Sequence, residues 1–361
     1  MYRPRVGIVG GGQLGRMLAL AGHRLGLDLI LYAQADEPAA QVVPHCVENL
    51  ETLAQQCDVL TFEHEWADVE ALALLQTRYP IAVWPSLATL EIIQDKYQQR
   101  NHLAQAGLPV PEFAAPSDWA GVEVFACEHG PQVVLKARRQ SYDGRGTQFW
   151  TLGETLPPWS PDWMVEARVP FERELAVMVA RTPKGEVAVY PVVETQQVNG
   201  VCDTVLVPAR VSALVATQAQ KLALWAVETI QAVGVVGVEL FLTAGDKLWV
   251  NELAPRPHNS GHYTLEGCQT DQFEQHLRAV LGWPLGDTDL VRSAAAMVNL
   301  LGTEREFKLW APLDLGDVHF HWYGKAPRLG RKLGHLTVLA DTVAEAWDRA
   351  RLARKRWEGQ G

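Results

Sequence analysis

The sequence lacks the features that would place the chain in a membrane or in an oxidising compartment. Its 361 residues include five cysteines, at positions 46, 57, 127, 202 and 268, and no two of them have C-x-x-C spacing. A zinc ribbon or a thioredoxin-like site is therefore not indicated, and scattered free thiols fit a reducing cytosol. No apolar run approaches the roughly 18 residues that suggest a membrane span. The N-terminus also lacks an apolar segment with a cleavage site, so we expect a cytoplasmic protein without a secretory signal.

Positive charge is also scarce. The chain has 32 Lys and Arg residues against 42 Asp and Glu residues, a formal net charge of −10. Binding to the phosphate backbone of nucleic acid requires a basic face, so nucleic acid is not expected as a partner. Small anionic substrates remain possible, because they need only a local cluster of donors.

The hydrophobic pattern predicts an α/β region followed by an α+β region. Residues 5–33 read as strand, glycine-rich turn, helix and strand, and 59–62 is a further strand followed by a helix at 69–76. This alternation is typical of a parallel sheet with helices on both faces. From residue 95 the predicted elements are helices at 95–106 and 212–233, strands at 133–137, around 166–181 and at 187–194, and a hairpin of 235–242 with 248–253. The tail from about 295 mixes strands with a helix at 342–357.

The glycine-rich turn matches the G-x-G-x-x-G pattern of dinucleotide-binding proteins at Gly10, Gly12 and Gly15. Such glycines let backbone N–H groups approach an anion at the start of a helix. A nicotinamide site usually also has an acidic residue at the end of the second strand. Here that strand ends at Gln34, and Asp36 lies beyond it. The missing acid argues against NAD or FAD, while another phosphate or polar ligand stays open.

The late hairpin places two carboxylates together. A turn at 243–246 puts Glu239 opposite Val250, so that Glu239 and Glu252 are diagonal neighbours on the same face of the sheet. Two carboxylates sharing a site with phosphates suit Mg²⁺, which prefers oxygen ligands. Two solvated glutamates on an exposed sheet face are the alternative. By strand parity Asn251 points to the other face, unless the strand is distorted there.

Polar donors follow the second carboxylate directly. Residues 254–262 include Arg256, His258, Asn259 and Ser260, and two prolines stiffen the segment. A loop of this kind can hold an anion beside a metal ion.

Two further regions offer groups for phosphates. Lys136 ends an apolar strand, and the loop 138–147 that follows has glycines that would let it close over a phosphate chain, although a surface hairpin is the alternative. The extended segment 166–169 could offer backbone groups to adenine, and Glu174 could hold ribose hydroxyls. Near the C-terminus, residues 325–332 contain four cations, Lys325, Arg328, Arg331 and Lys332, which could bind a phosphate monoester.

Taken together, these segments resemble the N5-carboxyaminoimidazole ribonucleotide synthetases, ATP-grasp enzymes of purine biosynthesis. The resemblance rests on residues 10–17, 61–65, 142–146, 170–174, 251–262, 272–279 and 323–335, in the order of the family. It implies an ATP-grasp fold with an N-terminal Rossmann-like (pre-ATP-grasp) domain at 1–94, an ATP-grasp domain at 95–294 and a small C-terminal domain at 295–361. It also implies a homodimer.

The resemblance implies a ligase that uses ATP, Mg²⁺ (with Mn²⁺ as an alternative ion), bicarbonate and 5-aminoimidazole ribonucleotide. Glu239 and Glu252 match the metal ligands. The residues that match nucleotide contacts are Lys96, Lys136, Ser141, Tyr142, Asp143, Gly144, Arg145, Gly146, Thr147, Glu166, Ala167, Arg168, Val169, Glu174, Gln197, Asn251 and Glu252. The residues that match catalytic positions are Arg256, His258 and Asn259, which would form the bicarbonate pocket, with Tyr142, Asp143 and Arg145. The residues that match contacts to the ribonucleotide are Gln13, Leu14, Glu63, Lys325, Arg331 and Lys332.

Two positions depart from the family pattern. Ser141 stands where a glycine is common, and Gln197 stands where some members have a histidine. Three other functions stay open from the residues alone: an ATP-grasp ligase that uses formate or another carboxylate, a nucleotide-sensing module without turnover, and an NAD oxidoreductase.

Overall fold

The N-terminal part of the chain is a parallel sheet with helices on both faces. The computed structural model describes residues 3–139, 146–304 and 306–360. Strands β1 (Arg5–Val9), β2 (Asp28–Tyr32), β3 (Cys46–Val47), β4 (Val59–Phe62) and β5 (Ala82–Val83) form a sheet in the order β3-β2-β1-β4-β5. Its helices are α1 (Gln13–Arg24), α2 (Leu50–Gln56), α3 (Val69–Arg78) and α4 (Leu87–Ile93). The predicted βαβ pattern is confirmed, because parallel strands buried on both faces read as continuous apolar runs.

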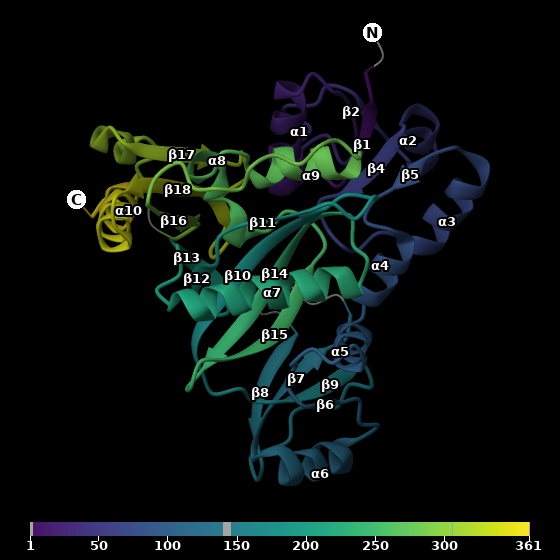
Figure 1. Cartoon of the computed structure of the whole chain (residues 1–361), viewed down its shortest axis with the longest axis vertical. Helices are drawn as coiled ribbons and strands as arrows, with labels where there is room; N and C mark the ends of the chain where they lie inside the picture. The colour runs from purple at the N-terminus through teal and green to yellow at the C-terminus, as the bar shows by residue number, and fades with distance from the viewer. Residues whose placement is uncertain (1–2, 140–145, 305, 361) are drawn as a thin grey trace.

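The two faces of this sheet have separate cores. Val6 and Ile8 pack with Met17 and Leu18 of α1 on one face, whereas Val9, Ile30 and Leu60 pack with residues of α2 and α3 on the other. Helix α9 (Gln272–Val280), more than 200 residues later, adds Phe273 and Leu277 to the first core. Figure 1 shows α9 beside α1, so the N-terminal sheet is fixed to a distant part of the chain.

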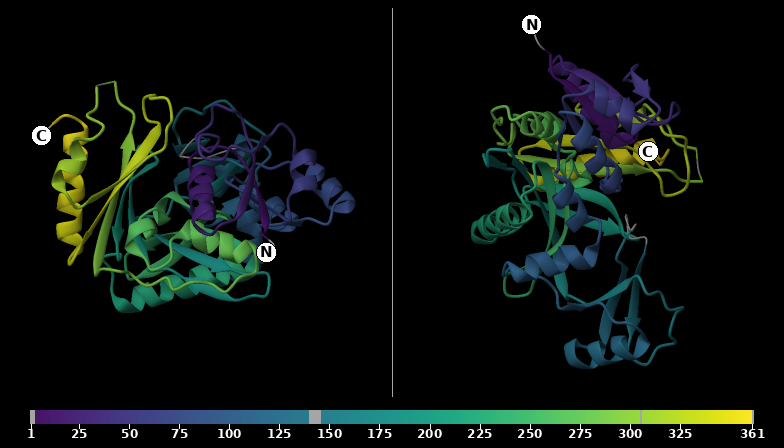
Figure 2. Two further views of the ribbon diagram at one scale, coloured as in Figure 1. Left: turned by 90° about the horizontal axis from the view of Figure 1, so that it is seen from above. Right: turned by 90° about the vertical axis from the view of Figure 1, so that its right-hand side faces the viewer.

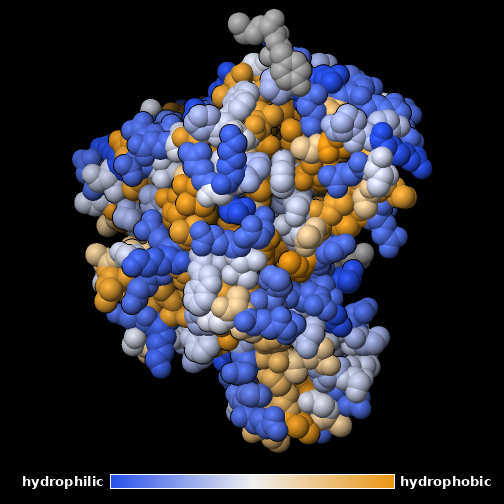
Figure 3. Space-filling model, turned by 45° about the vertical axis from the view of Figure 1, so that its right-hand side comes forward, coloured by the Kyte–Doolittle hydropathy of each residue, from blue (hydrophilic) through white to orange (hydrophobic). Residues whose placement is uncertain are grey.

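A small lobe follows. Helix α5 (Lys96–Gln105) leads into an antiparallel sheet of order β6-β9-β7-β8, made of β6 (Phe113–Ala114), β7 (Gln132–Ala137), β8 (Thr147–Thr151) and β9 (Trp163–Ala167). Helix α6 (Trp119–His129) covers it with Val122 and Phe125 against Val133, Leu135 and Val165. Figure 2 shows this lobe projecting from the rest of the molecule, and the space-filling view shows it set off by an indentation (Figure 3).

A nine-stranded antiparallel sheet forms the remaining body. Its main order is β15-β14-β10-β12-β13-β16-β18-β17, with β11 paired to β10. The strands are β10 (Phe171–Arg181), β11 (Val187–Val189), β12 (Val193–Val198), β13 (Val201–Val207), β14 (Gly234–Thr243), β15 (Lys247–Ala254), β16 (Ala294–Leu301), β17 (Val318–Trp322) and β18 (Lys332–Ala340). The helices are α7 (Ala213–Thr229), α8 (Thr264–Gly267) and α10 (Val343–Trp357), with short 3-10 turns η1 (Asn259–Gly261) and η2 (Ala311–Leu315). Since β13 pairs with β16, the sheet continues across the predicted boundary at 294/295, and the domain limits stay predictions.

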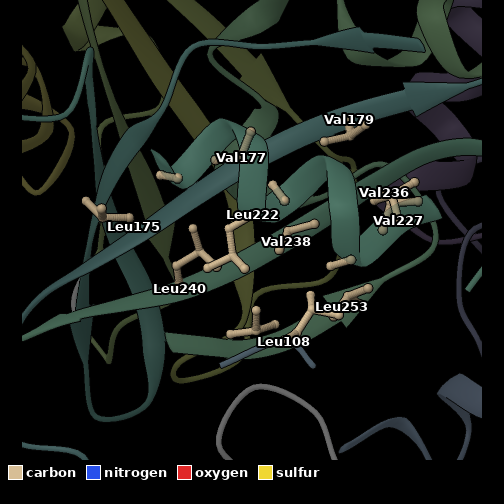
Figure 4. Packing of buried hydrophobic residues seen from close by; sticks show 14 of the residues in the cluster. Leu108, Leu175, Val177, Val179, Leu222, Val227, Val236, Val238, Leu240 and Leu253 are labelled. Carbon is tan, nitrogen blue, oxygen red and sulfur yellow. The ribbon is translucent and has the colours of Figure 1, made fainter. Parts of the chain in front are cut away.

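The core of this body lies between α7 and the strands that hold the paired carboxylates. Leu222 and Val227 of α7 pack against Val177 of β10 and Val238 of β14, and the other members of the cluster lie around them (Figure 4). Their 0–8% exposure means that these strands cannot shift without opening a packed interior. The packing therefore fixes the strands from which the site is built.

Two predicted elements were wrong in their limits. The single strand expected at 187–194 is two strands, β11 and β12, which break around Pro191, a residue without an N–H for the ladder. The helix expected at 212–233 ends at Thr229, and Gln231 (φ 50°) and Gly234 (φ 104°) have left-handed backbones that no helix continues through. Within the described residues, no helix has the length and apolar character needed to cross a membrane.

Candidate active site

The two carboxylates of the hairpin lie closer together than predicted. Glu239 of β14 is directly opposite Glu252 of β15, not diagonal to it, because the register shifts between Glu239 and Leu240. The extra residue is Asn251, which the distorted strand turns toward the carboxylates, so that its Nδ2 donates to Glu239 Oε2 at 3.4 Å. Asn251 was predicted to reach the carboxylates only if the strand were distorted, and the structure has such a distortion at this residue.

The turn of this hairpin is also shorter than predicted. Thr243 pairs with Lys247, which leaves a three-residue loop with left-handed backbones at Gly245 (φ 74°) and Asp246 (φ 59°). Three-residue loops are among the commoner hairpin connections. The changed turn and the shift at Asn251 together put the two glutamates on the same face.

The environment drives the pKa values of the two glutamates apart. Burial, then Glu252 and Glu174, raise the pKa of Glu239 to about 7. Burial also acts on Glu252, but Lys96, whose Nζ lies 2.7 Å from Oε2, lowers its pKa overall. Glu252 is thus ionised and paired with a lysine. Glu239 is partly protonated near neutral pH, and an incoming cation would displace its proton.

These donors fit Mg²⁺ bound with a nucleotide. Within the described residues no group of three or more His, Cys, Asp or Glu side chains could hold a metal ion alone. Mg²⁺ differs from Zn²⁺ in that it is usually held by one or two carboxylates together with substrate phosphates and water. Two facing carboxylates beside lysines match that arrangement.

A buried ion-pair network lies next to the carboxylates. Lys136 of β7 places Nζ 2.6 Å from Glu166 Oε2, and Arg100 of α5 donates from Nε to Glu166 Oε1 at 2.8 Å. Burial acts to raise the pKa of Glu166, but the two cations lower it to about 2. Lys136 also donates to Asn251 Oδ1 at 3.4 Å, so it lies between the small lobe and the hairpin. The side chain of Glu166 therefore holds Lys136 in place.

The segment 166–169 joins the small lobe to β10, where the sequence predicts adenine contacts. The amides of Ala167 and Arg168 already donate to Glu112 O at 2.9 Å and Gln132 O at 3.2 Å, and Val169 O accepts from Phe171 at 2.9 Å. These bonds hold the link in a fixed extended path between the small lobe and β10.

Glu174 lies on β10, next to the carboxylate hairpin, and Gln197 lies on β12, the strand beyond β10. In β10, Glu174 is paired with Phe241 and Ala176 with Glu239, so Glu174 and Glu239 are on the same face. Thr195 of β12 is opposite Glu174, and Gln197 follows two residues later on that face. Burial raises the pKa of Glu174 to about 7. Three neighbouring strands thus bring predicted nucleotide and metal residues onto one surface.

Residues 256–259 form a rigid loop beside Glu239. Arg256 donates from Nε to Glu65 Oε2 at 2.7 Å and from Nη2 to Oε1 at 3.4 Å. Burial acts to raise the pKa of Glu65, but Arg256 lowers it to about 2. His258 Nε2 lies 3.7 Å from Glu239 Oε1, and its Nδ1 is 2.8 Å from Ser260 Oγ. Asn259 is paired with Asn299. Glu65 was quoted in the sequence motif at 61–65 but given no role, because only the fold brings it to Arg256.

The glycine-rich turn is occupied by a carboxylate of the protein itself. Glu63, at the end of β4, accepts from Gly12 N at 2.5 Å and from Gly15 N at 2.8 Å. A Cβ at Gly12 would lie 2.7 Å from Glu63 Oε1, so any larger residue there would have to displace this carboxylate. The acid fills the place where a dinucleotide would put its pyrophosphate, which explains why the pattern does not indicate NAD or FAD.

A cationic cavity lies beside this turn. It measures about 240 Å³, and its lining residues are Gly12, Asp36, Glu37, Pro38, Gly324, Lys325, Ala326, Arg328 and Arg331. Lys325 Nζ lies 2.5 Å from Gln13 Oε1, and Arg331 Nη1 donates to Ala326 O at 3.1 Å. Lys332 begins β18, and Leu14 packs on the core of α1. Three of the four C-terminal cations, Lys325, Arg328 and Arg331, therefore line one cavity with Gly12 of the N-terminal turn, whereas Lys332 is not among its lining residues.

Part of the predicted lid can be placed. Gly146 O accepts from Ala137 N at 2.7 Å, and Thr147 pairs with Lys136. Ser141, Tyr142, Asp143, Gly144 and Arg145 lie outside the described residues.

Comparison with known proteins gives the same class of enzyme. The chain matches the ribonucleotide synthetase preATP-grasp domain over residues 3–94, the ATP-grasp domain over 101–273 and the phosphoribosylaminoimidazole carboxylase C-terminal domain over 295–349. With the site described above, these matches define an ATP-grasp ligase that uses ATP.

The relatives specify the family. N5-carboxyaminoimidazole ribonucleotide synthase of Mycobacterium tuberculosis (strain H37Rv) is 43% identical over 99% of this chain and 88% of the relative. That of Synechococcus elongatus is also 43% identical, over 92% and 89%. The chain belongs to the N5-carboxyaminoimidazole ribonucleotide synthase family of purine biosynthesis.

Solved structures agree. The Thermotoga maritima synthetase is 39% identical with a TM-score of 0.87, covering 98% of both chains. The Aspergillus clavatus synthase complexed with ATP is 34% identical with a TM-score of 0.90, covering 99% of both. The same Aspergillus enzyme, solved with ADP and 5-aminoimidazole ribonucleotide, is 32% identical with a TM-score of 0.88, again over 99% of both. The predicted family and the ATP-grasp fold are confirmed.

Proposed function

We propose that this enzyme carboxylates 5-aminoimidazole ribonucleotide to N5-carboxyaminoimidazole ribonucleotide, with ATP and bicarbonate as co-substrates and ADP and phosphate as products. The observation on which the proposal depends is the position of the Glu239–Glu252 pair. On one side it faces Lys96 and Lys136, which suit nucleotide phosphates, and on the other it meets His258 of the polar loop. The site thus places groups suited to a phosphate donor and groups suited to an anionic acceptor at adjacent positions.

In the proposed reaction, a bicarbonate oxygen attacks the γ-phosphorus of ATP and forms carboxyphosphate with release of ADP. Carboxyphosphate then releases phosphate and CO₂, and the exocyclic amine of the ribonucleotide forms a new C–N bond with the carbon and loses a proton. Mg²⁺, or Mn²⁺ in its place, would neutralise phosphate charge when bound to Glu239 and Glu252. Phosphoryl transfer of this kind depends mainly on positioning and charge stabilisation.

The polar loop is suited to hold bicarbonate. Arg256 is fixed by two hydrogen bonds to Glu65, which orients the guanidinium before any substrate arrives. A preoriented donor loses little energy in reorganising as negative charge develops. His258 and Asn259 complete the proposed pocket, because both lie in the rigid segment next to Glu239.

The cationic cavity is suited to the phosphate of the ribonucleotide. Arg331 supplies a planar fork and Lys325 a point charge, the two kinds of cation that bind phosphate monoesters. Gln13 and Glu63 at the neighbouring turn can contact the rest of the substrate. We further propose a homodimer in the cytoplasm, with domain limits at 94/95 and 294/295, on the resemblance to the family.

A coupled assay of ADP release tests the function. ADP release should require ATP, bicarbonate and 5-aminoimidazole ribonucleotide together, and omission of any one should abolish it. The Glu252→Gln variant should lose activity by orders of magnitude and keep its fold. Full turnover with formate in place of bicarbonate, or with a different ribonucleotide and none with this one, would contradict the proposal.

A further inference from the structure

Two buried asparagine side chains face each other behind the polar loop. Asn259, at the start of η1, donates from Nδ2 to Asn299 Oδ1 at 3.0 Å, and Asn299 donates from Nδ2 to Asn259 Oδ1 at 2.7 Å. Asn299 lies in β16 and is 1% exposed, and Asn259 is 8% exposed. The two amides therefore form a closed pair in which each gives and receives one hydrogen bond.

A backbone carbonyl fixes the orientation of both side-chain amides. Asn299 Nδ2 also donates to Cys202 O at 2.8 Å. A carbonyl can only accept, so the atom of Asn299 that faces it must be the amide nitrogen and not the oxygen. That assignment leaves Asn299 Oδ1 for the other amide, which must then turn its own nitrogen toward it. The orientation of Asn259 thus follows from Cys202 through Asn299.

Pairing with Asn299 uses one N–H of the Asn259 amide and leaves its second N–H available for a ligand. An amide nitrogen has two protons, and Asn299 takes one of them. Across residues 3–139, 146–304 and 306–360, the Asn259 side chain makes no other hydrogen bond. In the reversed orientation Asn259 would place oxygen against oxygen and nitrogen against nitrogen, and it would turn its carbonyl to the position that the N–H now has. An N–H attracts an oxyanion and a carbonyl repels it.

We propose that Asn299 is a positioning residue of the reaction, which holds the Asn259 amide with an N–H directed at the anionic acceptor in the polar loop. The inference rests on the proposed function, in which that acceptor is bicarbonate. Asn299 does not touch the substrate and acts through Asn259 alone.

The position of Asn299 gives the C-terminal strands a part in the reaction. In the ladder of β16 and β18, Asn299 is opposite His335, three residues after Lys332 and four after Arg331. The strand pair that orients Asn259 thus also begins next to the cations proposed to bind the ribonucleotide phosphate. Acceptor and substrate are held by the same piece of sheet.

Steady-state kinetics of Asn299→Leu test the inference. Leucine has the same number of side-chain heavy atoms and the same branching at Cγ as asparagine, but it has no hydrogen-bonding groups, so the Asn259 amide becomes free to rotate into the reversed orientation. We expect KM for bicarbonate to rise about 10-fold or more, as for loss of a hydrogen bond to a charged group, with KM for ATP and for the ribonucleotide within about twofold. Thr337→Val is the matched control. Thr337 is a fully buried polar residue of β18, the strand paired with β16, and its Oγ1 has no partner within the described residues. Its replacement should leave all three KM values unchanged.

A double-mutant cycle separates positioning from general damage. If Asn299 acts through Asn259, then Asn259→Ala combined with Asn299→Leu should have the same KM for bicarbonate as Asn259→Ala alone. The inference would be overturned if the two substitutions raised KM for bicarbonate independently, so that their fold-changes multiplied in the double variant. It would also be overturned if Asn299→Leu changed this KM by less than twofold. Should the leucine variant fail to fold, Asn299→Ser is the substitute, because its hydroxyl cannot span the pair, and the same outcomes apply. Wild-type ADP release that does not depend on bicarbonate would instead overturn the proposed function and this inference with it.

Discussion

The raised pKa of Glu239 predicts how metal binding depends on pH. Burial and the facing carboxylate of Glu252 bring the pKa of Glu239 to about 7, whereas Lys96 keeps Glu252 ionised. A divalent cation that uses both carboxylates must compete with the proton on Glu239. The apparent affinity for Mg²⁺ should therefore fall as pH decreases through 7 and level off above 8.

The size of the effect follows from the fraction of Glu239 that is ionised. With a pKa of about 7, about one molecule in eleven is ionised at pH 6 and about ten in eleven at pH 8. The Mg²⁺ concentration that gives half-maximal activity should therefore be about tenfold higher at pH 6 than at pH 8. Because the two carboxylates are coupled, this is the titration of the pair as a whole.

The assay is ADP release at saturating ATP, bicarbonate and ribonucleotide, titrated with Mg²⁺ at several pH values between 6 and 8. Glu239→Gln is the control, since it has no proton to lose and should bind Mg²⁺ weakly at every pH. The phosphates of ATP also titrate in this range, but they affect both proteins equally. The ratio of the two half-maximal concentrations should thus change about tenfold across the range. A constant ratio would refute the reasoning that Glu239 both titrates near pH 7 and binds the metal ion.

Three further predictions concern other parts of the molecule. Glu166→Gln should lower the free energy of unfolding by about 3–5 kcal/mol, since Arg100 and Lys136 would lose a buried counter-ion, and an unchanged urea midpoint would contradict this. Burial lowers the folded-state pKa of His276 to about 3, so the unfolded chain takes up a proton below about pH 6.5 that the folded chain excludes. Wild type should therefore lose about 2 kcal/mol more stability than His276→Gln between pH 7 and pH 5, and parallel losses would show that this histidine is protonated in the fold. Arg331→Gln should raise KM for the ribonucleotide about 10- to 100-fold, and an equal rise in KM for ATP would argue against a local phosphate contact.

Elements with strong local periodicity were predictable from the sequence. The N-terminal strands and α1 follow from continuous apolar runs around a glycine turn, and α5 begins at Lys96 with Asp95 as its N-cap, whose side chain accepts from Tyr97 N. The carboxylate hairpin was also placed correctly in the chain. These features depend on neighbours within a few residues, and sequence patterns report such neighbours directly.

The register of the hairpin was not predictable, because distant residues decide it. Strand β15 is at the edge of its sheet, and its outer side is paired with α5 and the loop after it. Arg100 donates to Val250 O at 2.7 Å, and Gln99 bonds both N and O of Leu253 at 3.0 and 3.3 Å. These partners, about 150 residues earlier, hold the strand on either side of Asn251. The sequence of 239–252 alone contains no sign of them.

The same limit applies to residues that orient the site. Arg256 was predicted from its place after the carboxylates, but its partner Glu65 comes from the segment after β4, in the N-terminal parallel-sheet region. Asn299 lies in an apolar strand, Ala294–Leu301, where a single amide looks like an ordinary buried polar residue. Its role is visible only once the fold sets it against Asn259.

The ion pairs of the site have a consequence for how a nucleotide can bind. Lys96 and Lys136, the two lysines predicted to contact phosphates, are each held by a glutamate, Glu252 and Glu166 respectively. A buried lysine without a counter-ion would be costly, so these pairs stabilise the site without ligand. The two pairs are not equivalent. Glu166 is also bonded to Arg100 and keeps a cation when Lys136 turns to a phosphate, whereas Glu252 has Lys96 as its partner and needs a replacement when that lysine moves. A divalent cation arriving with the nucleotide is such a replacement, so phosphate binding by Lys96 and metal binding by Glu252 should occur together.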